Sequence, residues 1–150
     1  MFPNLLKDAE VYAEHAKPHF EHAGLTVAEA WHNGRISYKK LETYAKICNL
    51  KGIVHLPSGT QTTRILPNGT PMVFMDEKLV HPKGSVEEIA SHIREATEGK
   101  DGPHFIVVYC APTKEITLKF EDILMLLDPE QYEPVRLDTM FELILQNEGK

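Results

Sequence analysis

Short apolar runs alternate with amphipathic helical patterns along the whole sequence. The strand patterns span residues 25–31, 53–56, 105–110 and 132–136, and the helical patterns span residues 4–23, 37–49, 85–96, 118–127 and 138–144. Parallel strands need crossover connections, and these connections are usually helices. The alternation therefore predicts an α/β fold with a mainly parallel sheet that is covered by helices on both faces.

The run Phe-Ile-Val-Val-Tyr-Cys at residues 105–110 is the strongest strand pattern in the chain. It is apolar at successive positions, which is typical of a strand that is buried on both sides within a parallel sheet. We therefore predict that residues 105–110 form a central parallel strand.

A hairpin pattern lies in the middle of the chain. Apolar residues at 65–66 and 72–75 flank the segment Pro-Asn-Gly-Thr-Pro, residues 67–71. Asn-Gly is the strongest short-range hairpin signal. Proline cannot donate a hydrogen bond to a central ladder, so the two prolines place the hairpin at an edge of the sheet.

The length and composition fit a single domain. A chain of 150 residues can bury a core without metals or disulfides, and its two cysteines are too few for a disulfide framework. The net charge of -6, without a Lys/Arg cluster, argues against nucleic-acid binding. No apolar run is long enough to cross a membrane, and the N-terminus lacks the layout of a signal peptide. We expect a soluble protein, and its compartment does not follow from the sequence.

Ligands of open α/β sheets bind beyond the C-terminal ends of the strands. Polar and aromatic residues follow these predicted ends, and seven of them are candidate site residues: Trp31, His32, Thr60, Gln61, Arg64, Asp76 and Glu115. A tryptophan at such a position can pack against the C–H face of a sugar ring, although it is more often a partly buried core residue. His32 would lie against the ligand beside it. Thr60, Gln61 and Arg64 would supply hydrogen bonds.

Asp76 and Glu115 are the candidate acid and base. Hydrolysis of a glycosidic bond uses two carboxylates that face the same substrate. Asp76 and its neighbour Glu77 would point to opposite faces of a strand, so Asp76 would need a partner such as Glu115 across the sheet edge. In the alternative interpretation, Asp76 and Glu77 only solvate the end of the hairpin.

No cofactor or metal is expected. The loop Ser-Gly-Thr-Gln-Thr-Thr at residues 58–63 has the hydroxyl groups of a flavodoxin phosphate loop, but it leads into a hairpin instead of a helix. His15, His19 and His22 have a spacing that suits a metal. We interpret them as a histidine stripe at an interface, because no carboxylate-bearing metal motif accompanies them.

The later part of the chain resembles a known family. The segments GIVHLPSG, NGTPMVFM, PHFIVVYCAPT and YEPVRLDTMFELI are similar to the C-terminal end of the glycoside hydrolase-like proteins named for their GxGYxYP motif. The resemblance implies an α/β fold, a saccharide as the ligand class, and a chain that is the C-terminal portion of a larger protein. The naming motif is absent, because no Gly-x-Gly-Tyr occurs, so the resemblance identifies no catalytic residue.

Two functions of different classes remain open. The first is a carbohydrate-related domain that binds a saccharide or another small polar ligand at the strand ends. The second is a non-catalytic assembly domain that self-associates or packs on a missing domain. It is favoured by the edge hairpin and by the histidine-flanked first helix.

Overall fold

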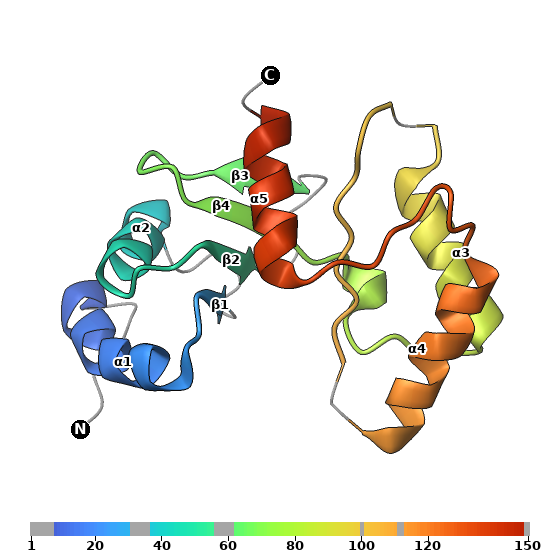
Figure 1. The fold of residues 1–150 in the computed structure, drawn as a ribbon, viewed down its shortest axis with the longest axis horizontal. Coiled ribbons are helices and arrows are strands. Elements are labelled where there is room, and N and C mark those ends of the chain that lie inside the picture. The colour runs from blue at the N-terminus through green and yellow to red at the C-terminus, as the bar shows by residue number, and fades with distance from the viewer. Residues whose placement is uncertain (1–7, 31–36, 56–61, 100, 111–112, 149–150) are drawn as a thin grey trace.

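A computed structural model describes residues 8–30, 37–55, 62–99, 101–110 and 113–148. Ten helices and strands occur in these ranges (Figure 1). They are α1 (Ala9–Ala23), β1 (Val27–Ala30), α2 (Tyr38–Ile47), β2 (Gly52–His55), β3 (Thr63–Ile65), β4 (Pro71–Phe74), the 3-10 helix η1 (Glu77–Leu79), α3 (Val86–Thr97), α4 (Lys114–Leu126) and α5 (Leu137–Glu148). None of the helices in these ranges is both long enough and apolar enough to span a membrane.

The strands form one sheet in the order β1-β2-β4-β3. β1, β2 and β4 are parallel, and β3 pairs antiparallel with β4 at the edge. The predicted α/β fold with an edge hairpin is therefore confirmed. Pro71 is the first residue of β4, a position where a strand tolerates proline. The turn is built as predicted, with Gly69 at φ 91° and with the Asn68 side chain accepting the Thr70 N–H at 3.1 Å.

Helices cover both faces of the sheet, as the sequence predicts. Side chains alternate between the faces along each strand, so Ile53 and Met72 face α1 and α2, while Val54 and Val73 face α5. The α1/α2 cluster contains Ala9, Ala13, Ala28, Leu41, Tyr44, Ala45, Cys48, Leu50, Ile53, Leu66, Met72 and Phe74. The α5 cluster contains Val54, Val73, Met75, Met140, Phe141 and Ile144.

α3 and α4 pack on each other beside the sheet (Figure 1), and a third group of apolar side chains belongs to this part of the fold. This α3/α4 cluster contains Leu79, Ile89, Ala90, Ile93, Ile123 and Leu127. Leu79 belongs to η1, which follows directly after β4. The short helix therefore connects the sheet to the α3/α4 cluster.

The prediction of a central strand at residues 105–110 is wrong. The segment makes a single parallel bridge, in which Tyr109 donates to the Leu79 carbonyl at 2.9 Å and accepts from the His81 N–H at 2.7 Å. The places on both sides of β4 are taken by β2 and β3. The apolar pattern of residues 105–110 has another cause. Phe105, Val107 and Tyr109 pack on the α5 cluster, and Ile106 and Val108 pack on the α3/α4 cluster.

Residues 132–136, also predicted as a strand, form no strand either. Side chains of this segment pack on two different clusters. Tyr132 packs on the α3/α4 cluster, and Val135 packs on the α5 cluster. α5 begins at Leu137, so Asp138 lies in its first turn and is not its cap. The Asp138 carboxylate instead accepts the N–H of Thr139 and pairs with Arg136 at 3.1 Å.

Candidate functional site

The three parallel strands end in line with one another. Ala30 at the end of β1 lies beside His55 at the end of β2, and His55 lies beside Phe74 at the end of β4. The segments that follow these residues therefore leave the sheet from the same edge. Four of the predicted site residues, Trp31, His32, Thr60 and Gln61, belong to segments that follow β1 and β2, and all four lie outside the described residues.

His55 is a polar residue that the sequence analysis missed at this edge. It is 3% exposed, and its ring lies 5.6 Å from the ring of Phe74. The sequence analysis treated residues 53–56 as an apolar strand. A histidine at the last position of such a strand was the available signal, because that position borders the ligand edge of a parallel sheet.

Arg64 reaches from β3 to the start of α2. It lies opposite Met72 in the β3–β4 pair, on the face of the sheet that α2 covers. Its guanidinium carbon is 3.8 Å from the ring centroid of Tyr38, the first residue of α2, so a cation–π contact fixes the side chain. No carboxylate in the described part of the chain forms an ion pair with Arg64. Among the described residues, therefore, no carboxylate occupies its N–H donors.

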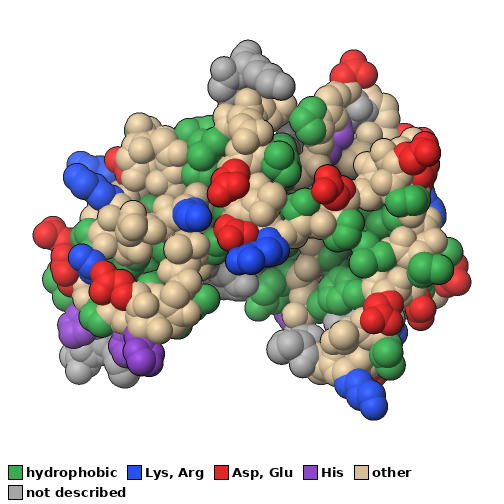
Figure 2. All heavy atoms as spheres, viewed as in Figure 1, with side chains coloured by type: hydrophobic (Ala, Val, Ile, Leu, Met, Phe, Trp, Pro, Cys, Tyr) green, Lys and Arg blue, Asp and Glu red, His purple; other side chains and the backbone are tan. Residues whose placement is uncertain are grey.

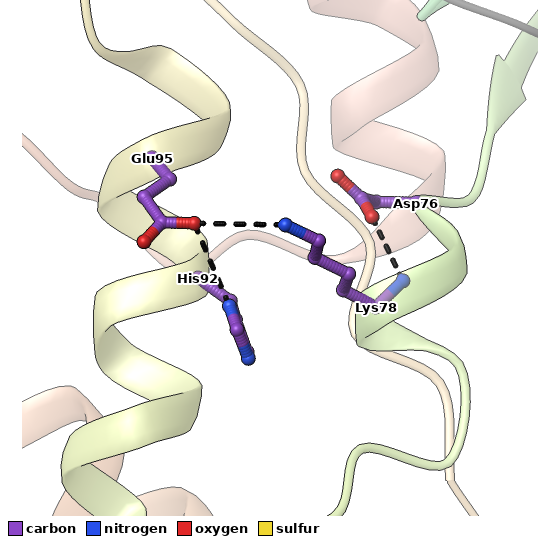
Figure 3. Close-up of polar contacts among 4 residues, drawn as sticks. All are labelled: Asp76, Lys78, His92 and Glu95. Carbon is purple, nitrogen blue, oxygen red and sulfur yellow. Dashed lines mark hydrogen bonds and ion pairs between the residues drawn. The ribbon is translucent and has the colours of Figure 1, made fainter.

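Asp76 lies just beyond β4, where the sequence analysis expected it, but its carboxylate has a structural role. The side chain accepts the Lys78 N–H at 2.9 Å and caps η1. Lys78 in turn lies near α3, with its Nζ 3.8 Å from Oε2 of Glu95 (Figure 3). The same oxygen is 3.6 Å from Nδ1 of His92.

Asp76, Lys78, His92 and Glu95 form a polar cluster between η1 and α3, and the ion pair between Lys78 and Glu95 connects the two helices. The 3.6 Å separation of His92 and Glu95 is longer than a hydrogen bond, and the buried Nδ1 of His92 has no hydrogen-bond partner among the described residues. The side chains of Lys78 and Glu95 are more than half exposed, so each ion pair contributes only about 0–1 kcal/mol. The Lys78–Glu95 pair therefore links η1 to α3 only weakly.

Glu115 lies in the first turn of α4. Its side chain is 80% exposed, and Oε1 is 3.7 Å from Nζ of Lys119 one turn further along the same helix. No hydrogen bond or ion pair between described residues joins Glu115 to Asp76. α4 packs on α3 rather than on the sheet, which separates the two carboxylates into different parts of the fold.

The remaining titratable candidates have structural surroundings. Cys48 is buried, its thiol donates to the Ala13 carbonyl at 3.5 Å, and burial raises the pKa of that thiol. Burial also raises the pKa of Cys110, and it raises the pKa of the Tyr44 phenol far above its usual value. The three histidines of α1 are exposed, and no group of three metal-ligating side chains occurs among the described residues.

Comparison with known proteins gives no relative. No family model matches the chain, and neither the curated proteins nor the solved structures contain a match. The resemblance to the GxGYxYP proteins therefore stays a prediction. Any function for this chain has to be argued from its own residues.

Proposed function

We propose that this chain is a carbohydrate-binding α/β domain whose ligand lies at the C-terminal edge of β1, β2 and β4. The common endpoint of the three strands supports this location, because the residues that follow in sequence include Trp31 and His32 after β1, Thr60 and Gln61 after β2, and Asp76 after β4. Parallel sheets bind ligands at that edge because loops from neighbouring strands converge there.

The contact between Arg64 and Tyr38 is the observation that carries the proposal. A guanidinium has five N–H donors in a fixed plane, and an aromatic ring beneath it holds that plane in one orientation. Donors fixed in this way bind hydroxyl or carboxylate oxygens of a sugar with less loss of side-chain entropy. Arg64 is only partly buried, so a ligand can reach it.

Each remaining residue of the proposed site has a role in this scheme. Trp31 and His32 would pack against the sugar ring, and Thr60 and Gln61 would hydrogen-bond its hydroxyl groups. The other carboxylate oxygen of Asp76 would accept a hydrogen bond from a sugar hydroxyl, since Oδ1 already accepts the Lys78 N–H.

Binding without hydrolysis is the activity that the geometry favours. Glycoside hydrolysis uses two carboxyl groups about 5–9.5 Å apart around the scissile bond. Asp76 caps η1 and Glu115 pairs with Lys119 on a helix of the α3/α4 cluster, so these two side chains have separate partners.

A saccharide panel tests this proposal. Saturation-transfer NMR with neutral and acidic oligosaccharides should reveal at least one ligand for the wild-type chain. Trp31→Ala, Gln61→Ala and Arg64→Met should each weaken that ligand about tenfold or more, which corresponds to about 1.4 kcal/mol. Arg136→Met is the matched control, because Arg136 is an exposed arginine that pairs with Asp138. Equal affinities in all four variants would disprove the site assignment.

A second candidate function, assembly with another chain, is favoured by the surface of α4. Leu118, Leu124, Met125 and Leu126 are 54%, 46%, 85% and 40% exposed. Figure 2 shows apolar side chains on the part of the molecule that α3 and α4 form. Sedimentation velocity over a wide concentration range should show association that Met125→Glu abolishes. A monomer at all concentrations would reject this candidate.

A further inference from the structure

An open hollow of about 390 Å³ lies on the opposite edge of the sheet from the proposed saccharide site. It is bordered by the residues that precede β2, by the hairpin turn that precedes β4, and by α5. Six of its lining residues matter for its chemistry: Leu50, Lys51, Pro71, Phe141, Glu142 and Leu145. Small-molecule sites occupy about 300–1,000 Å³, so the hollow is large enough for a small ligand.

Two opposite charges line this hollow, and neither has an ion-pair partner in the described part of the chain. Lys51 and Glu142 are both exposed, and neither forms an ion pair with any other described residue. Asp138, the third charged residue of the lining, differs because Arg136 already neutralises it at 3.1 Å. Figure 2 shows acidic and basic side chains together in the middle of the face that α5 occupies.

Apolar side chains complete the lining. Leu50, Pro71 and Phe141 are buried, and Leu145 on α5 is 42% exposed. These residues come from the start of β4, the residues before β2, and α5, so all three sides of the hollow contribute apolar surface. Among the residues that the structure describes, the hollow therefore has one cation and one anion without an ion-pair partner, and an apolar lining.

We propose that this hollow binds a small zwitterion of the amino-acid class. The ligand carboxylate would lie toward Lys51, its ammonium group toward Glu142, and an apolar side chain against Pro71 and Leu145. A ligand with a single charge would satisfy one of the two protein charges and leave the other without a partner. The zwitterion satisfies both charges, and its net charge matches the balanced charge of Lys51 and Glu142.

Titration with L-leucine, followed by the backbone amide spectrum, tests this proposal directly. Saturable shifts are expected at Lys51, Gly69, Thr70 and Glu142. Isopentylamine, which keeps only the ammonium group, and 4-methylpentanoate, which keeps only the carboxylate, should each bind about tenfold more weakly. The absence of saturable shifts with L-leucine overturns the proposal, and so does equal binding of all three compounds.

Charge-removing variants assign the two ends of the ligand. Lys51→Met should weaken L-leucine about tenfold while leaving isopentylamine unchanged, and Glu142→Gln should show the converse pattern with 4-methylpentanoate. Lys46→Met and Glu14→Gln are matched controls on α2 and α1, where both residues are exposed. Both should bind L-leucine like the wild type. If Lys51→Met and Glu142→Gln also bind it like the wild type, the proposal fails.

Discussion

The ring of Phe141 in α5 lies directly against the backbone of Gly52, the first residue of β2. A Cβ at Gly52 would overlap three ring carbons of Phe141. The missing side chain therefore lets α5 approach the sheet closely, at the point where one wall of the hollow meets β2. Phe141 is 1% exposed, so the ring has little room to move away.

Gly52→Ala should therefore destabilise the fold. Inserting a methyl group into a packed core typically costs about 1–3 kcal/mol, and here the overlapping atoms belong to a buried ring. Urea unfolding of the wild type and the variant measures the cost. In a Phe141→Leu background the same substitution should cost clearly less, because the overlapping ring is gone. An equal cost in both backgrounds would contradict the close packing.

Ser85→Ala should destabilise α3 by about 1 kcal/mol. The Ser85 hydroxyl accepts the Glu88 N–H at 3.2 Å and caps the helix. Ser91→Ala on the same helix is the control, since alanine is the better helix former at an interior position. Thermal unfolding should place the midpoint of Ser85→Ala below the wild type and that of Ser91→Ala at or above it. The reverse order would show that the cap contributes nothing.

The stability of the fold should decrease in alkaline solution, partly through Cys48. Burial raises the pKa of this thiol above its ordinary value of 9.0. The folded chain therefore keeps the proton at a pH where the unfolded chain releases it. Stability from this group is complete below that ordinary pKa and is lost as the pH rises through the folded value. Urea midpoints of the wild type and Cys48→Ala, measured at neutral pH and near pH 10, provide the test.

Between those two conditions the wild type should lose more stability than Cys48→Ala. Tyr44 contributes to the alkaline loss in both proteins, because burial raises the pKa of its phenol as well. The difference between the two proteins therefore reports the thiol together with its charge effect on the Tyr44 phenol. If both lose the same stability, the environment of Cys48 is not as the structure has it.

The sheet and its covering helices followed from local sequence patterns. Ile53 and Val54, and likewise Met72 and Val73, are neighbours that point to opposite faces, and short apolar runs of this kind predict burial on both sides. The turn at Asn68-Gly69 is equally local, because its conformation depends on side-chain chemistry within a few residues. These elements were predictable for that reason.

Residues 105–110 show where local patterns fail. An apolar residue at every position indicates burial on two sides, but the pattern does not show what provides the burial. In this fold the two sides are the α5 cluster and the α3/α4 cluster, so the segment is buried like a central strand without being one. Hydrogen bonding to β4 was not available, because β2 and β3 already occupy both of its edges.

The candidate site was predictable in outline only. Arg64 and Asp76 lie where the strand order places them, since each is close in sequence to a strand end. The position of Glu115 depends on where α4 packs. Whether α4 packs on the sheet or on α3 is a tertiary preference, which the sequence of α4 alone does not encode. His55 could have been recognised from its position as the last residue of a parallel strand.

Binding of a saccharide beside Arg64 is the central claim, and the side-chain Nε–H resonance of Arg64 tests it most directly. We predict that titration with the oligosaccharide identified in the panel shifts this resonance saturably, with the same dissociation constant as the shifts at the ends of β2 and β4. The resonance should disappear from the spectrum of Arg64→Met, which identifies it. An Arg64 Nε–H resonance that stays in place while the saccharide saturates other amides would contradict the proposed site. The same conclusion would follow if no saccharide in the panel shifted any resonance at this edge.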